Sequence, residues 1–151
     1  MFGLEFWGSS PFGGYRLRAE YADTACNFMR EVPEYNCAYR NSIYPQGYAY
    51  RGRIIGHAMD NDSRMTSVAG LLTRPGGDVV SVRVRRTELN RDGTGDHAIS
   101  SVPQDAYNVE LRYSRMFGIG KVSIGADFED RSPDTDPGED IHAFLTWQQG
   151  F

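Results

Sequence analysis

Apolar and polar side chains alternate with a period of two along most of this 151-residue chain, and a helical period persists nowhere. In Ala106–Ser114, for example, Tyr107 and Val109 alternate with Asn108 and Glu110. The same alternation is found in three other segments, Tyr15–Thr24, Val79–Thr87 and Lys121–Glu129. Because successive side chains of a strand point to opposite faces, the pattern predicts strands with one apolar and one polar face.

About nine strands are predicted by this pattern. They cover Phe2–Gly8, Tyr15–Thr24, Cys37–Ile43, Tyr48–Ile55, Arg64–Thr73, Val79–Thr87, Ala106–Ser114, Lys121–Glu129 and Ile141–Phe151. Short connections alternate with longer polar ones such as Glu88–Asp105, and Cys37–Ile43 is counted as a strand because it makes this alternation regular. Short turns at one end and long loops at the other are typical of outer-membrane barrels.

The apolar faces could belong to a soluble sandwich, which buries them, or to a membrane barrel, which turns them to lipid. The last segment favours the barrel, because it places Ile141, Ala143, Leu145, Trp147 and Phe151 on one face and resembles the terminal sorting strand of such proteins. No run of about eighteen apolar residues occurs, which excludes a membrane-spanning helix. We therefore predict an all-β, antiparallel, up-and-down segment of a transmembrane barrel, seen as an open curved sheet.

Residues 47–63 form the most specific stretch of the sequence. It reads G-Y-x-Y-R-G-R, then G-H, then D-x-D-S, with the motif residues Tyr48, Tyr50, Arg51, Gly52, Arg53, Gly56, His57, Asp60, Asp62 and Ser63. Glu20–Thr24 and Tyr44 fit the same pattern, whereas Cys37 departs from it. From Gly14 to Phe151 the chain resembles the Wzi family of capsule-assembly proteins.

The resemblance implies an outer-membrane barrel of about eighteen strands, of which residues 1–151 are one domain, the C-terminal half. Its N-terminal half and signal peptide would be missing, since Met1–Trp7 lacks the basic region of a secretory signal. The implied function is non-enzymatic binding of capsular polysaccharide, for assembly or attachment at the cell surface, without a cofactor. The implied partners are an anionic capsular polysaccharide, outer-membrane lipid and the barrel-assembly machinery.

Arginine dominates the polar faces of the predicted strands. Of the 16 basic residues only Lys121 is a lysine, and arginine grips carboxylates through two parallel hydrogen bonds. The arginines outnumber the acids that face them, which predicts a wide, wet lumen that attracts uronic acids or other anionic sugars. A salt-bridge network that stiffens the wall is the structural alternative. The candidate binding residues are Arg16, Arg18, Arg51, Arg53, Arg83, Arg85 and Arg112. The tyrosines Tyr48 and Tyr50 would face lipid from the same strand as Arg51 and Arg53.

Two groups of acidic residues resemble calcium ligands in composition, but neither predicts a calcium site. Asp60, Asn61 and Asp62 are too close together for an EF-hand and predict an Asx-rich turn. Asp134, Asp136, Glu139 and Asp140 predict a solvated loop, so no metal site is predicted. In an oxidising compartment Cys26 and Cys37 would close a small loop, with a stabilisation of about 3 kcal/mol, and the alternative is two independent thiols.

Two other functions remain open at this point. The first is a porin-like channel that passes anionic solutes through the same lumen. The second is a small eight-stranded barrel with hydrolase activity, which would use a serine with one of His57, His97 and His142. The sequence contains neither G-x-S-x-G nor H-E-x-x-H, which argues against an enzyme. The formal net charge of −4 argues against a nucleic-acid binder.

Overall fold

The computed structural model describes residues 1–38, 49–50, 53–54, 57–94, 97–118, 120–133 and 140–149. Every regular element in these ranges is a β-strand, and they contain no helix that is long and apolar enough to cross a membrane. The strands are β1 (Phe2–Ser10), β2 (Gly13–Asp23), β3 (Ala49–Tyr50), β4 (Arg53–Ile54), β5 (Arg64–Thr73), β6 (Val79–Leu89), β7 (Gln104–Phe117), β8 (Gly120–Ser132) and β9 (Asp140–Gln148).

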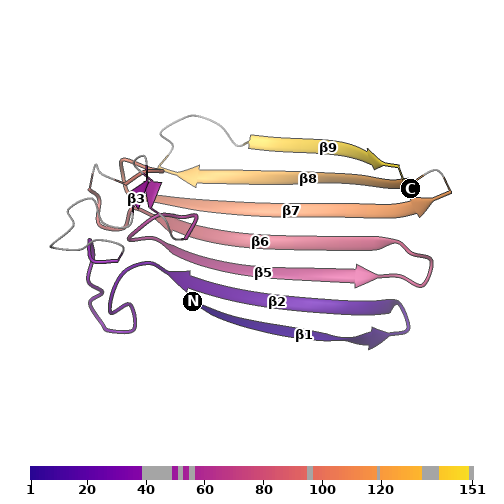
Figure 1. The fold of residues 1–151 in the computed structure, drawn as a ribbon, viewed down its shortest axis with the longest axis horizontal. Helices are drawn as coiled ribbons and strands as arrows, with labels where there is room; N and C mark the ends of the chain where they lie inside the picture. The colour runs from indigo at the N-terminus through magenta and orange to yellow at the C-terminus, as the bar shows by residue number, and fades with distance from the viewer. Residues whose placement is uncertain are drawn as a thin grey trace.

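Seven of these strands form one antiparallel sheet in the order β1-β2-β5-β6-β7-β8-β9 (Figure 1). The ladders are long, and that between β7 and β8 runs from Asp105↔Ser132 to Phe117↔Gly120. Among the described strands β1 pairs only with β2, and β9 only with β8, so both edges of the sheet are open. The predicted all-β, up-and-down, open sheet is confirmed. The described strands do not form the closed eight-stranded barrel considered above as an alternative.

One of the predicted wall strands is wrong, and most of a second lies outside the described residues. The segment predicted at Tyr48–Ile55 instead holds β3 and β4, which pair with each other as a separate two-stranded sheet. The edge of β2 is fully occupied by β5, because their ladder runs without interruption from Gly14↔Thr73 to Asp23↔Arg64. At Cys37–Ile43, Cys37 and Ala38 are not in a strand, and the remainder lies outside the described residues. Among the described residues, no strand of the large sheet lies between β2 and β5.

With this correction the connections separate cleanly by length. The three tight turns, between β1 and β2, β5 and β6, and β7 and β8, lie at one end of the sheet (Figure 1). The C-terminal ends of β2, β6 and β8, which the three longer connections follow, lie at the opposite end. We call these the turn end and the loop end. The predicted asymmetry of outer-membrane barrels is thus obtained with fewer wall strands than the sequence suggested.

One face of the sheet, the outer face, is apolar and exposed. Its paired rows include Leu4, Ala19, Val68, Val84, Val109, Phe128 and Ile141, one residue from each strand. Leu4 is 66% exposed and Leu145 is 72% exposed. Exposing a whole face of such side chains to water would be energetically unfavourable. Aromatic side chains bound this face, with Tyr21 and Tyr107 near the loop end and Tyr15, Tyr113 and Trp147 near the turn end. Tyr21 lies six positions after Tyr15, which is about 20 Å along a strand and close to the height of a lipid-facing band.

The most buried residues lie at the loop end. Ala22, Met59 and Leu89 form a small apolar cluster, with Met65 packed against it. Around this cluster a larger group of polar residues is also buried, namely Thr24, Asp60, Asn61, Asp62, Ser63, Asn90, His97 and Ser100. We call this group the loop-end polar core. The long connections are thus held together by polar contacts, while the strands form a single layer.

Candidate functional site

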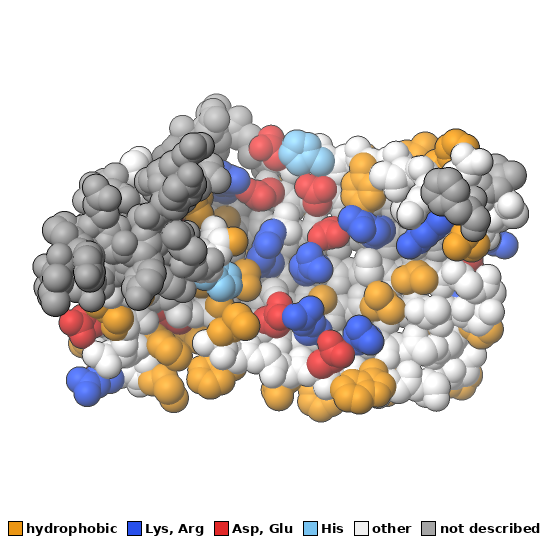
Figure 2. All heavy atoms as spheres, in the orientation of Figure 1, with side chains coloured by type: hydrophobic (Ala, Val, Ile, Leu, Met, Phe, Trp, Pro, Cys, Tyr) orange, Lys and Arg blue, Asp and Glu red, His pale blue; other side chains and the backbone are white. Residues whose placement is uncertain are grey.

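The face of the sheet opposite the apolar one, the inner face, carries charges in register. One row of paired residues runs from β1 to β9 as Glu5, Arg18, Ala69, Arg83, Glu110, Asp127 and His142. The neighbouring rows contain Arg16 and Arg112 on the turn side and Arg85 on the loop side. Five of the seven predicted arginines therefore share one face. Figure 2 shows acidic and basic side chains gathered over the middle of this face.

A hollow of about 190 Å³ lies on the inner face over β2, β5 and β6. Ala69 occupies the row position between Arg18 and Arg83, and its methyl group leaves space between the two longer side chains. The lining residues are Glu5, Arg16, Arg18, Ala69, Gly70, Leu71, Ser81, Val82, Arg83 and Glu110. The hollow is smaller than a site for a drug-sized ligand, so it suits one unit of a longer polymer.

The arginines around the hollow are paired but exposed. Arg16 Nε lies 3.5 Å from Glu5 Oε1, Arg18 Nη2 lies 2.5 Å from Glu20 Oε1, and Arg83 Nη1 lies 3.2 Å from Glu110 Oε2. The three arginine side chains are 61%, 56% and 51% exposed. Ion pairs this open to water contribute at most about 1 kcal/mol each to stability. These guanidinium groups are therefore free to exchange their partners for a ligand carboxylate at little cost.

Arg85 and Arg112 complete the described set. Arg85 donates from Nη2 to Asn108 Oδ1 at 3.3 Å, and Arg112 Nη2 lies 3.5 Å from Glu110 Oε1. Glu110 thus serves both Arg83 and Arg112. Arg51 lies outside the described residues. Arg53 belongs to β4, which is not part of the wall, so its prediction as a wall residue is wrong.

The positive surplus predicted for the whole inner face is also wrong. Glu5 and Asp140 join the acids there, and the charges of the described strands nearly balance once Lys121 and Arg131 are included. Both signs occur on several of the strands, since β2 also supplies Glu20, and β8 supplies Lys121 and Arg131 as well as Asp127 and Glu129. The lining of the hollow, with Arg16, Arg18 and Arg83 against Glu5 and Glu110, keeps a small positive excess.

Phe144 is an inner-face residue that the sequence prediction missed. It pairs with Gly125, where an added Cβ would lie 2.4 Å from Phe144 Cζ and 2.7 Å from the Leu111 carbonyl oxygen. The ring thus leans across the glycine, and the guanidinium of Arg112 lies 5.0 Å from its centroid. This contact fixes the position of Arg112. The signal available in the sequence was a glycine within an alternating strand, which often marks a close approach.

A second pocket, of about 360 Å³, lies at the loop end of the inner face. Its polar lining comes from His57, Arg85, Asn108, Glu129 and Arg131. Its apolar lining consists of Met59, Met65, Leu89 and Ile99, with Ala58, Thr87 and Ala106 beside them. Because Arg85 and Asn108 lie one row beyond Arg83 and Glu110, this pocket and the hollow follow one another along the same strands.

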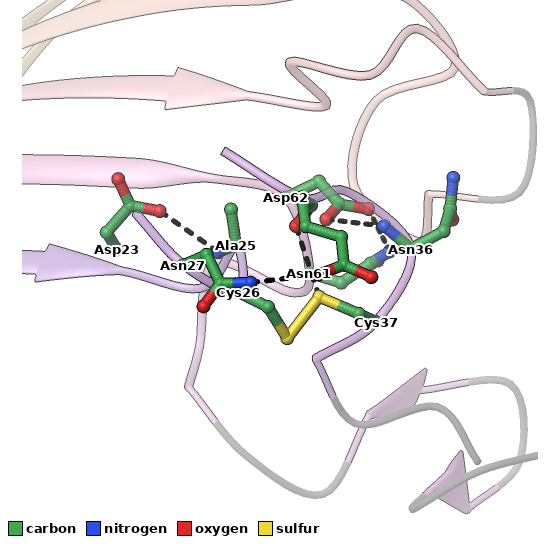
Figure 3. The surroundings of a disulfide bond; sticks show 9 residues. Asp23, Ala25, Cys26, Asn27, Asn36, Cys37, Asn61 and Asp62 are labelled. Carbon is green, nitrogen blue, oxygen red and sulfur yellow. Dashed lines mark hydrogen bonds between the residues drawn. A yellow bond between two sulfur atoms is a disulfide. The ribbon is translucent and has the colours of Figure 1, made fainter. Parts of the chain in front are cut away.

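The D-x-D-S motif lies in the loop-end polar core rather than at a ligand site. Asp60 accepts bonds from the backbone N–H groups of Asn61 (2.9 Å) and Ala98 (2.6 Å). Asp62 Oδ1 accepts one from the Asn36 N–H at 3.0 Å (Figure 3). Both aspartates have a positive φ, which fits an Asx-rich turn. The motif therefore ties together the connections that follow β2, β4 and β6.

Ser63 and His97 form a hydrogen-bonded pair whose polarity is unsuited to catalysis. His97 Nδ1 accepts from the Ser100 N–H at 3.1 Å, so Nε2 carries the hydrogen and donates to Ser63 Oγ at 3.0 Å. A general base would need to present an acceptor nitrogen to the serine. Ser63 is also completely buried and donates onward to the Asn61 carbonyl oxygen. The pair stabilises the loops.

Comparison with known proteins identifies the family. A sequence model of the capsule assembly protein Wzi family matches residues 1–141. The chain belongs to the Wzi family. A solved structure, described as Wzi, an outer membrane protein involved in group 1 capsule assembly in Escherichia coli and a carbohydrate-binding β-barrel, matches with a TM-score of 0.69 and 18% identity. The match covers 93% of this chain and 30% of that one. No curated protein sequence matches significantly.

Membership of the Wzi family and the fold together confirm the predicted family and the outer-membrane location. The described residues of the family-like motif, however, do not form a strand of the seven-stranded sheet. Tyr48, Arg51, Gly52 and Gly56 lie outside the described residues, and Tyr50 and Arg53 belong to the small β3–β4 sheet. His57 lines the loop-end pocket, and Asp60, Asp62 and Ser63 are buried in the polar core.

Proposed function

We propose that this Wzi-family chain binds anionic capsular polysaccharide on its inner face, without catalysis, for assembly or attachment of the capsule. The observation that carries the proposal is the hollow of about 190 Å³ between Arg16 and Arg18 on one side and Arg83 on the other. A carboxylate placed there would accept charge-assisted hydrogen bonds from two strands at once. The polymer would continue along the strands into the loop-end pocket, where Arg85 and Arg131 supply further cations.

We also propose that the chain is an arc of a larger barrel wall. Both edge strands, β1 and β9, lack a second partner among the described strands, and open edges are not tolerated in lipid. The chain spans 30% of the matched Wzi structure, which leaves room for the strands that would complete the wall. In this arrangement outer-membrane lipid covers the apolar face, and the barrel-assembly machinery inserts the intact protein.

The double variant Arg18→Gln/Arg83→Gln tests the binding proposal. It removes a charge from each side of the hollow and keeps most of the side-chain length. A hydrogen bond to a charged group contributes about 1.5–3 kcal/mol, so we expect binding of a uronate-containing oligosaccharide to weaken by about tenfold or more for each arginine. Lys121→Gln is the matched control, because it removes an exposed inner-face charge that lines neither pocket.

The measurement is titration calorimetry on the intact protein in detergent, with a neutral oligosaccharide of equal length for comparison. Affinity of the wild type should fall as salt rises, because ions screen exposed charge pairs. Unchanged affinity in a folded double variant would show that the hollow is not the binding site. Anion conductance in planar bilayers without oligosaccharide binding would instead favour the porin-like alternative.

A further inference from the structure

The loop closed by the disulfide leans on the outer face of the sheet. Cys26 and Cys37 are bonded, and Phe28 inside this loop packs against two outer-face rings of the first strand pair. Its centroid lies 6.1 Å from that of Phe2 and 6.2 Å from that of Tyr21. Phe2 and Tyr21 pair directly and lie near the loop end of the apolar face. The loop therefore extends the lipid-facing surface beyond the ends of the strands.

The loop is held in one conformation by several independent bonds. Besides the disulfide, Cys26 and Glu34 exchange two backbone hydrogen bonds of 2.9 Å, and Arg30 donates its N–H to the Asn27 carbonyl oxygen at 2.8 Å. At the base of the loop, Asn36 donates its N–H to Asp62, which fastens the loop to the polar core (Figure 3). The side chains at its tip are thus held in a defined position relative to the wall.

The tip presents apolar side chains to the surroundings. Met29 is 82% exposed and Val32 is 78% exposed, more than the outer-face residue Leu145 of the edge strand β9 at 72%. Single exposed apolar residues are ordinary in water. Here, however, two of them project from a fastened loop whose third apolar side chain, Phe28, joins the aromatic belt at Tyr21. Continuity with the lipid-facing surface therefore points to lipid as the occupant.

We propose that the Cys26–Cys37 loop is a membrane-interface anchor that inserts Met29 and Val32 into the outer-leaflet lipid at the loop end of the barrel. Phe28 connects the anchor to the aromatic belt. The exposed Arg30, between the two inserted side chains, lies at the level of the phosphorylated headgroups and interacts with them. The disulfide serves this function by keeping the short apolar tip directed toward the lipid.

Photo-crosslinking in the intact protein in its native outer membrane tests the proposal. A benzophenone amino acid replaces Met29 or Val32 and, as controls, the adjacent β9 residues Leu145 and Thr146, which face outward and inward respectively. We expect lipid adducts at positions 29 and 32 with yields within about threefold of that at position 145. Position 146 should give at least about tenfold less, because it faces the interior of the wall. Adducts are identified by mass spectrometry.

Adducts from positions 29 and 32 to polypeptide, either another part of the chain or a second copy, would overturn the proposal, as would the absence of any adduct while position 145 reacts with lipid. A second variant tests the role of the disulfide. Cys26→Ser/Cys37→Ser should retain the lipid adduct at position 145 and lose most of the adduct at position 29. An undiminished adduct at position 29 would show that the disulfide does not hold the anchor.

Discussion

Replacing Asp23 by Ala should be among the most destabilising single changes in this chain. The Asp23 side chain is fully buried, and it binds Arg64 Nε at 3.1 Å and Arg91 Nη1 at 3.0 Å. It also accepts bonds from Tyr21 Oη and from the Ala25 N–H, each at 3.0 Å. Arg91 is only 12% exposed, so losing the carboxylate leaves a nearly buried cation without its main partner. Breaking a buried pair in this way costs about 3–5 kcal/mol.

Urea unfolding of the intact protein in lipid vesicles measures this change. Glu5→Ala is the control, because its partner Arg16 is 61% exposed and the pair should contribute less than about 1 kcal/mol. Asp23→Asn should lie between the two, since the amide oxygen still accepts hydrogen bonds but carries no charge. If Asp23→Ala destabilises the protein no more than Glu5→Ala does, the assignment of Asp23 as the main connection between β2, β5 and the β6–β7 loop is wrong.

Two further changes test the packing of the inner face and of the polar core. Gly125→Val should lower the free energy of unfolding by about 1–3 kcal/mol, because its Cβ would lie 2.4 Å from Phe144 Cζ. Gly76→Ala, whose Cβ would have no atom within 4 Å, should be near neutral. Equal urea midpoints for the two variants would contradict the close approach of Phe144. Ser63→Ala should lower the free energy of unfolding by about 1–3 kcal/mol, because His97 Nε2 and the Asn90 N–H would lose Ser63 Oγ as their acceptor. An unchanged unfolding curve would show that the serine does not stabilise the polar core.

The wall strands could be predicted from the sequence because each strand has one apolar face and one polar face. The alternation at Ala106–Ser114 and Lys121–Glu129 lies within β7 and β8, and their ladder puts Tyr107, Val109 and Leu111 on one face as expected. A one-residue slip would turn every apolar side chain inward, so the pattern specifies the register strongly. The family followed from a short motif whose residues the structure places mostly outside the wall.

The sequence prediction failed where long-range pairing outweighed local pattern. Tyr48–Ile55 alternates well enough to suggest a strand, but β5 pairs with β2 over its whole length and leaves no edge for it. Gly52 interrupts that segment, and glycine weakens a strand. The partnership of Ser63 with His97 joins residues 34 apart, and no local signal predicts it. Phe151, which favoured the barrel prediction, lies outside the described residues.

The most direct test of the account is chemical labelling at the hollow. Ser81 lies on the inner face and lines the hollow, while Val84 on the same strand is 49% exposed on the outer face and does not line it. In the intact protein in lipid nanodiscs, a water-soluble maleimide should react with Ser81→Cys and be excluded from Val84→Cys by lipid. A uronate-containing oligosaccharide should slow the reaction of Ser81→Cys, and a neutral one of equal length should not. Equal labelling of the two cysteines, or full reactivity of Ser81→Cys with the acidic oligosaccharide bound, would contradict the account.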